Sequence, residues 1–201
     1  MNHAYGRSRN IYVGVAAGLA TCFVYPLLIA VSLPRPLTVV LSCSIGPLLG
    51  IACWGLREFL NLSGRKVTAD LGAASNAMAG ALFTAMLLVQ LAIKTTANSP
   101  SPETAAVWLG LDVAWDVYIG LGTILFSISA FSHPRLGKAV GVSGSIIGLA
   151  LLVLNISTFP TPPASAGLVD PGPFVGLWYL ITTVAMLRSR KWISDTSSTI
   201  V

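Results

Sequence analysis

The chain has 201 residues, of which 54% are hydrophobic and only 9% are charged. Because about 25% of the residues in a typical soluble domain are charged, this composition excludes a soluble globular protein. The net charge of +5 does not indicate nucleic-acid binding, since the basic residues occur singly or in short clusters and form no continuous basic face. We expect a single all-α domain over residues 1–201, a bundle of transmembrane helices in the lipid bilayer.

Six apolar runs are each long enough, or nearly so, to cross about 30 Å of hydrocarbon. They cover residues 11–32, 37–56, 71–93, 105–131, 139–158 and 173–187. Capping signals precede two of the runs, namely Ser101-Pro102-Glu103 before the fourth and Asp170-Pro171 before the sixth. The sequence therefore predicts six transmembrane helices.

The connecting segments predict the orientation of these helices. Arg35 and Lys94 fall on one side of the predicted membrane, and the other ten basic residues fall on the opposite side. Those ten are Arg7, Arg9, Arg57, Arg65, Lys66, Arg135, Lys138, Arg188, Arg190 and Lys191. Because loops rich in Lys and Arg stay in the cytoplasm, both chain ends are predicted to be cytoplasmic. The loops near residues 33–36, 95–104 and 159–172 are then external.

Three glycine pairs have the GxxxG spacing that allows two helices to approach closely in lipid. They are Gly14/Gly18, Gly46/Gly50 and Gly144/Gly148. These pairs predict tight packing, either between helices of this chain or against a second copy or another membrane protein.

The fourth run contains two acids, although ionisable residues are rare and costly inside a membrane. Asp112 and Asp116 are four residues apart, so they lie on one helix face, which also carries Trp108 and Trp115. The opposite face is aliphatic and includes Val107, Val117, Leu121 and Leu125. This pattern predicts that the acids point into the bundle.

The predicted orientation also gives the depth of the two acids in the membrane. At 1.5 Å per residue, Asp112 lies about 10 Å and Asp116 about 16 Å below the outer end of the run. Gln90 and Asn76 share one face of the third run, and Asn155 lies near the outer end of the fifth. We expect Asp112, Asp116, Gln90 and Asn155 to converge on a pocket that opens outward, with Asn76, Trp108 and Trp115 as further candidates for binding a substrate or an ion.

Two carboxylates this close do not both ionise easily, so we expect at least one to be protonated near neutral pH. Such a pair suits cation binding, proton coupling or acid catalysis. Alternatively, the pair only ties helices together through hydrogen bonds.

We predict no metal site and no cofactor, because the cysteines Cys22, Cys43 and Cys53 lack ligand spacing and no nucleotide-binding motif occurs. No catalytic residue can be assigned.

The second half of the chain resembles a pattern found in small bacterial polytopic membrane proteins of no assigned activity. Residues 108–190 carry it, as Leu111-Asp112-x-x-Trp115-Asp116, Phe159-Pro-Thr-Pro-Pro163 and Gly172-Pro173-x-x-Gly176-Leu177-Trp178-Tyr179. The resemblance implies a multi-pass protein of the bacterial inner membrane.

Three classes of function remain open. Six spans and the pair Ala16/Ala20 resemble the substrate-binding subunits of energy-coupling-factor vitamin transporters, which implies binding or transport of a small molecule or ion. A protonated aspartate beside tryptophans resembles integral-membrane terpene cyclases, which implies an enzyme acting on a lipid or isoprenoid. The third class is a structural or accessory membrane subunit.

Overall fold

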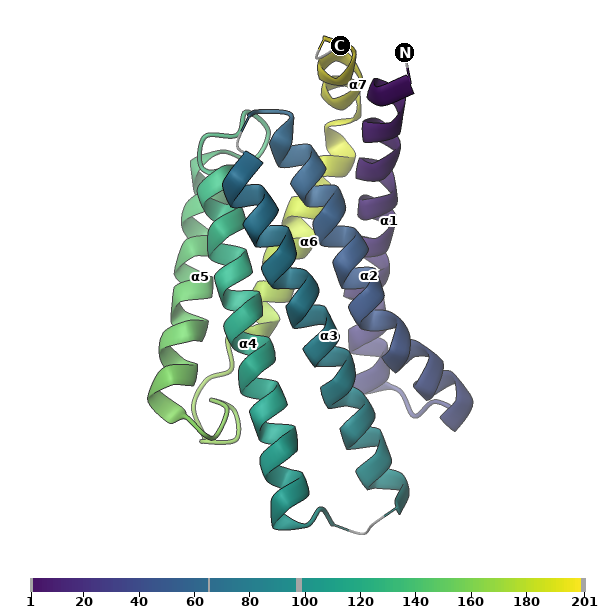
Figure 1. Cartoon of the computed structure of the whole chain (residues 1–201), viewed down its shortest axis with the longest axis vertical. Coiled ribbons are helices and arrows are strands. Elements are labelled where there is room, and N and C mark those ends of the chain that lie inside the picture. Colours follow the sequence, from purple (N-terminus) through teal and green to yellow (C-terminus); the bar gives the residue numbers. More distant parts are fainter. Residues whose placement is uncertain (1, 65, 97–98, 200–201) are drawn as a thin grey trace.

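The computed structural model describes residues 2–64, 66–96 and 99–199, which form seven α-helices and no strand (Figure 1). The helices are α1 (Asn2–Ala30), α2 (Arg35–Asn61), α3 (Lys66–Thr96), α4 (Pro102–Ala130), α5 (Gly137–Thr158), α6 (Gly172–Arg188) and α7 (Arg190–Thr199). By length and composition, α1 to α5 are suited to crossing a membrane. The predicted all-α architecture with several apolar membrane helices is therefore confirmed.

Each predicted apolar run lies within one helix, apart from the last residues of some runs, and most helices extend beyond the run by several residues. The extensions consist of polar or interfacial residues. Such residues continue the helix but do not raise its mean hydropathy. Helix α6 is shorter than α1 to α5, because it has only 17 residues. Its length is about 25 Å at 1.5 Å per residue, less than the hydrocarbon thickness of about 30 Å.

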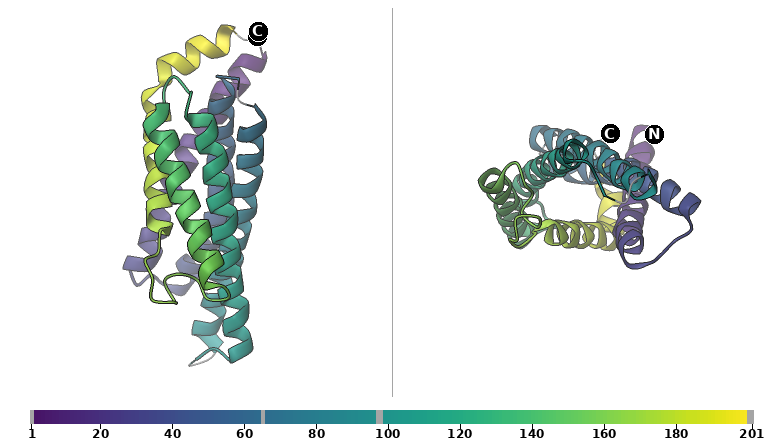
Figure 2. Two further views of the ribbon diagram at one scale, coloured as in Figure 1. Left: turned by 90° about the vertical axis from the view of Figure 1, so that its left-hand side faces the viewer. Right: turned by 90° about the horizontal axis from the view of Figure 1, so that it is seen from below.

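Helices that follow one another in the chain pack side by side from α1 to α5. Helix α6 then packs against both α1 and α5 and closes the bundle into a ring (Figure 2). Both chain ends lie at the same end of the bundle (Figure 1). Short connections between antiparallel neighbours produce this order, because each apolar helix buries its polar face against the next one.

Most of the predicted glycine contacts occur between helices of this chain. A Cβ added at Gly14 would meet the backbone of Gly55, so α1 and α2 touch there through their main chains. Gly46 meets Gly80 on α3 in the same way. Gly50 has open space around it, although the sequence places it in an equivalent pair. Gly18, Gly144 and Gly148 contact α6 or α4 of the same chain.

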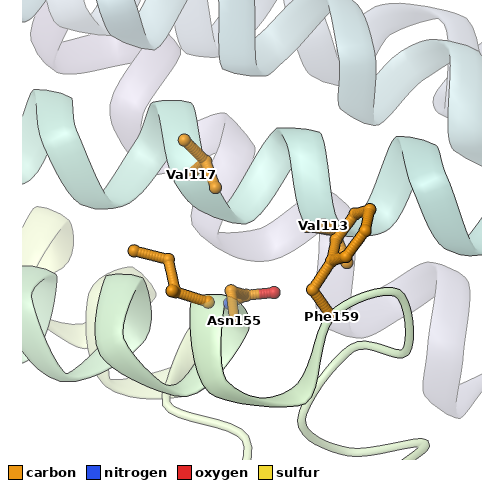
Figure 3. Close-up of a pocket in the computed structure, with 5 residues that line it drawn as sticks. Val113, Val117, Asn155 and Phe159 are labelled. Atoms are coloured by element: carbon orange, nitrogen blue, oxygen red, sulfur yellow. The ribbon is translucent and has the colours of Figure 1, made fainter.

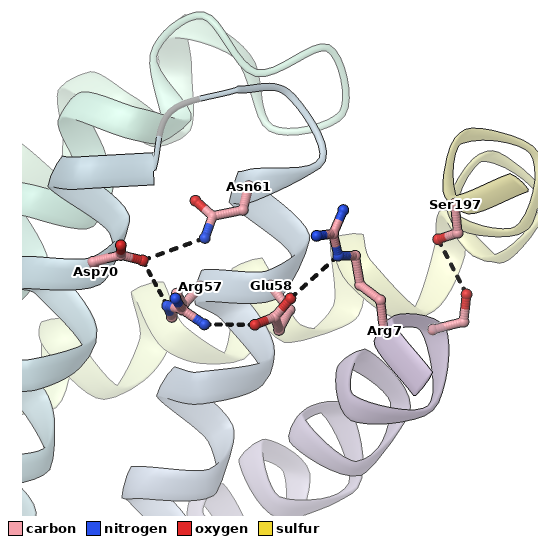
Figure 4. Close-up of polar contacts among 7 residues, drawn as sticks. Arg7, Arg57, Glu58, Asn61, Asp70 and Ser197 are labelled. Atoms are coloured by element: carbon pink, nitrogen blue, oxygen red, sulfur yellow. Dashed lines mark hydrogen bonds and ion pairs between the residues drawn. The ribbon is translucent and has the colours of Figure 1, made fainter. Parts of the chain in front are cut away.

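An ion-pair network joins α1, α2 and α3 at the end of the bundle that carries the termini (Figure 4). Arg57 contacts Glu58 at 2.5 Å and Asp70 at 2.6 Å. Arg7 reaches the second oxygen of Glu58 at 3.4 Å, and the Asn61 amide donates to Asp70. The network leaves these interfacial charges paired. Arg65, which belongs to the predicted basic set, lies outside the described residues.

Helix α7 was not expected from the sequence. It lies across the end of the bundle (Figure 2), where Trp192 packs edge-on against Phe59 and His133. Ile193 is fully buried, and Ser197 pairs with Ser8 of α1 at 3.1 Å. The pattern of Trp192, Ile193 and Ser197 on one side of a short polar segment was the available signal, but the segment is too polar for a hydropathy criterion to find.

Candidate functional site

The start of α6 lies part of the way along the bundle. The Thr123 hydroxyl donates to the Tyr179 oxygen at 3.4 Å, which places these two residues of α4 and α6 at one depth. Seven residues earlier in each helix are Asp116 and Gly172, both about 10 Å nearer the end opposite the termini. Helix α6 therefore begins at the level of Asp116. Residues 159–171 connect it to the far end of α5 without forming a long helix.

A cavity of about 570 Å³ lies beside the start of α6. Its walls come from the second half of α1, from parts of α2, α3 and α4, from residues 162–170 and from α6. The segment between α5 and α6 contributes Pro162, Pro163, Ala164 and Asp170 to the wall of the cavity. The volume is within the range of about 300–1,000 Å³ typical of small-molecule sites.

Three carboxylates line this cavity: Asp112 and Asp116 from α4, and Asp170 from the segment before α6. Among the described residues that line it, none is a lysine, arginine or histidine. Asp170 also accepts a hydrogen bond from the backbone N–H of Gly172 at 2.8 Å, although the N-cap of α6 is Pro171, one residue after the predicted cap. Because the sequence indicated only a helix cap at Asp170, this aspartate was not identified as a residue of the site.

Asp116 and Asn155 are brought together as expected. The Asn155 amide nitrogen donates to Asp116 Oδ2 and to the Leu151 carbonyl, both at 2.9 Å. Asp116 is 5% exposed and Asn155 is fully buried. No described residue forms a hydrogen bond with the other Asp116 oxygen or with the Asp112 carboxylate. The cavity therefore contains carboxylate oxygens for which the described part of the chain supplies no hydrogen-bond donor.

Asn155 also lines a smaller cavity of about 390 Å³ beside α4 and α5 (Figure 3), and it is not among the residues that line the acidic cavity. Apolar side chains line this second cavity, namely Val113, Val117, Ile156 and Phe159. The side-chain oxygen Oδ1 of Asn155 is buried and has no hydrogen-bond partner among the described residues. The smaller cavity is thus almost entirely apolar, and we assign the candidate site to the larger one.

Aromatic rings from three helices form one wall of the acidic cavity. Trp115 stacks on Phe83 of α3 with ring centroids 4.5 Å apart, and Phe83 meets the edge of Tyr25 of α1 at 5.2 Å. All three residues line the cavity. Tyr25 was not identified from the sequence, because a single tyrosine in an apolar run carries no signal of its own.

The remaining candidates lie elsewhere. Trp108 packs with the cluster around Phe83 and Met86 and does not line the cavity. Gln90 is half-buried on α3 and also lies outside the cavity wall. Asn76 is fully buried and reaches the cavity only indirectly, through Tyr179.

Replacing Tyr179 with phenylalanine tests this indirect link. The Tyr179 hydroxyl donates to Asn76 Oδ1 at 2.7 Å, so Tyr179→Phe leaves a buried amide oxygen without a donor. We expect the free energy of unfolding to fall by about 1–3 kcal/mol, as measured by denaturant unfolding in detergent micelles. Tyr12→Phe is the matched control, because Tyr12 is exposed. Equal stabilities of the two variants would show that the Asn76 contact contributes nothing.

No protein-family model, curated protein or solved structure matches this chain. A function for the cavity therefore has to be argued from its shape, charge and lining.

Proposed function

We propose that this protein is a six-span membrane protein that binds a small molecule or ion in its acidic cavity and transports it as a carrier. The observation that carries the proposal is the placement of three carboxylates on one cavity of about 570 Å³ with no basic residue among its described lining residues. Buried charges in membrane proteins usually pair with one another or face a functional cavity. Asp112 has no such partner among the described side chains, so the second case applies.

The predicted orientation supports an outward opening. The charged ends of α1, α5 and α6 lie with both termini at one end of the bundle, and Arg35 and Lys94 belong to the opposite end. If the basic end is cytoplasmic, the first half of α4 lies in the outer half of the membrane. The cavity, which uses that half of α4, then faces outward.

The short sixth helix favours transport over a purely structural role. Carriers often place their sites near the middle of the membrane, where a helix begins or ends part of the way across. Helix α6 begins at the depth of Asp116, which matches this arrangement. A purely structural role would also account for the hydrogen bond between Asn155 and Asp116. It would not account for the position of the Asp112 and Asp170 carboxylates on the cavity wall.

Cys22 offers a direct test, because it lines the cavity and is only half-buried. In a Cys43→Ser, Cys53→Ala background, a membrane-impermeant thiol reagent applied to intact cells is expected to label Cys22 from outside. Gly176→Trp should slow the labelling, since Gly176 lines the cavity and has open space for a side chain. Gly110→Trp, which is equally uncrowded but lies outside the cavity wall, should not.

Two results would contradict the proposal. Labelling only after the membrane is opened would place the cavity on the cytoplasmic side or isolate it from water. Equal labelling of the Gly176→Trp and Gly110→Trp variants would show that the reagent reaches Cys22 by a route other than the cavity.

An enzyme is the second candidate, and the aromatic wall is the observation that favours it. Rings next to a carboxylic acid suit the protonation of an isoprenoid and the stabilisation of its cation. Incubation with prenyl substrates, followed by mass spectrometry, would detect a product in the wild type that the Asp116→Asn variant does not form.

A further inference from the structure

We infer that the solute is a monovalent organic cation with an apolar body, such as a protonated amine or a quaternary ammonium ion. The inference rests on the proposed function and names the class of solute for the same cavity. Three features of the cavity carry it: the sign of its charge, the spacing of its acids and its aromatic wall.

The charge of the lining selects against anions. Asp112, Asp116 and Asp170 all face the cavity, and no described lining residue carries a positive charge. An anion there would meet like charges in a low-dielectric setting, where repulsion is strong. A cation would instead supply the partner that Asp112 and the second oxygen of Asp116 lack.

The spacing of the acids disfavours a bare metal ion. Within the described part of the chain, no three side chains from His, Cys, Asp and Glu come close enough together to hold a metal. A calcium ion needs about six to eight oxygen ligands at 2.3–2.6 Å, so it requires converging groups. Carboxylates spread around a large cavity suit a larger ion whose charge is surrounded by carbon.

The aromatic wall suits the body of such an ion. The wall consists of three rings from three helices. Tyr25 contacts Phe83, Phe83 contacts Trp115, and all three rings line the same cavity as the acids. Trp115 lies one residue before Asp116, so the ring and the carboxylate belong to one turn of α4. Cations are attracted to the faces of aromatic rings, most strongly where water is excluded.

Asn155 acts as a positioning residue in this arrangement. Its amide donates to one oxygen of Asp116 and holds the carboxylate in place, which leaves the second oxygen for the solute. Because Asn155 is neutral, it does not cancel the negative charge of the site.

The single-cysteine protein described above allows a test with probes of opposite charge. We expect a cationic thiosulfonate to label Cys22 at least about 10-fold faster than an anionic one, after each rate is divided by the rate with a free thiol. The Asp112→Asn, Asp116→Asn, Asp170→Asn triple variant, which removes all three carboxylates from the cavity, should reduce this preference to less than about twofold. Glu103→Gln, which removes an exposed acid outside the cavity, should leave the preference unchanged.

Protection by small probes of one skeleton gives the second readout. Phenethylammonium should slow the labelling of Cys22, whereas 2-phenylethanol and phenylacetate at the same concentration should not. Phe83→Leu should weaken the protection by phenethylammonium, expressed as a fraction of the labelling rate of the same variant without a probe.

The outcomes separate the two proposals. Equal normalised rates for the cationic and anionic reagents, or equal protection by phenethylammonium and 2-phenylethanol, would overturn the organic-cation inference while labelling from outside still supports a solute cavity. An absence of labelling from outside would overturn both. Loss of the charge preference in Glu103→Gln would also overturn the inference, because the selectivity would then come from the surface.

Discussion

The Gly14→Val substitution is expected to lower the free energy of unfolding by about 3 kcal/mol, because overpacking a tight contact forces a shift of the backbone. A Cβ at Gly14 would overlap the main chain of Gly55, and main-chain atoms cannot rotate away as a side chain can. The helices α1 and α2 would have to separate along a contact that also includes the buried Val15 and Leu56. Denaturant unfolding in detergent micelles, followed by far-UV circular dichroism, measures the change.

Gly50→Val is the matched control for this prediction. Gly50 belongs to a GxxxG pair just as Gly14 does, but nothing lies within 4 Å of a Cβ built there. Its effect should stay within about 0.5 kcal/mol, as for most substitutions away from packed contacts. If both variants lose the same stability, valine is acting on each helix separately and the α1–α2 contact is not responsible.

Lowering the pH is expected to destabilise the protein through His133, in the turn between α4 and α5. Arg135 N–H donates to His133 Nδ1 at 3.2 Å, so this nitrogen carries no proton. The opposite nitrogen, Nε2, then donates to the Phe59 carbonyl at 3.3 Å. Only the first contact needs the neutral ring, because a proton on Nδ1 would break it, whereas Nε2–H can donate to the Phe59 carbonyl in either protonation state.

Burial lowers the pKa of His133 to about 4, and the nearby Arg135 charge adds to the effect, although the Phe59 carbonyl opposes it. In the unfolded chain the same ring has a pKa of about 6.5. Between these values the unfolded state binds a proton that the folded state does not. Stability is therefore fully present above about pH 6.5 and is lost as the pH falls towards 4. The loss amounts to about 3 kcal/mol, from about 1.4 kcal/mol per pKa unit.

The measurement compares the wild type with His133→Gln from pH 7.5 to pH 4. Because every other ionisable group is the same in both proteins, the difference between the two curves isolates the histidine. The wild type should lose its advantage over the variant as the pH falls. Parallel curves would show that the buried ring does not control the pH dependence.

The candidate site was only partly predictable. Asp112 and Asp116 could be found in the sequence because an acid in an apolar run is costly and therefore conspicuous. Their spacing also placed Trp115 on the same face. Tyr25, Phe83 and Asp170 could not be found in this way, because a tyrosine or phenylalanine is ordinary in an apolar run and an aspartate is ordinary at a helix start.

Local sequence was sufficient for the helices themselves. Each long helix follows from an apolar run, because in lipid the backbone must satisfy its own hydrogen bonds and the helix is the structure that does so within one segment. The same physics explains why α7 was missed: it lies across the end of the bundle, and its stability comes from Trp192 and Ile193 packing against other helices.

The sequence by itself determined that the chain is an all-helical membrane protein with two acids on an inward face of one helix. Only the tertiary structure decided which glycines are in contact, so that Gly14 and Gly50 differ although their sequence pattern is the same. Only the tertiary structure decided that α6 begins at the depth of Asp116, which brings Asp170 to the cavity. The physical reason is that hydropathy and spacing describe one helix at a time, whereas the depth and neighbours of a residue depend on how helices pack.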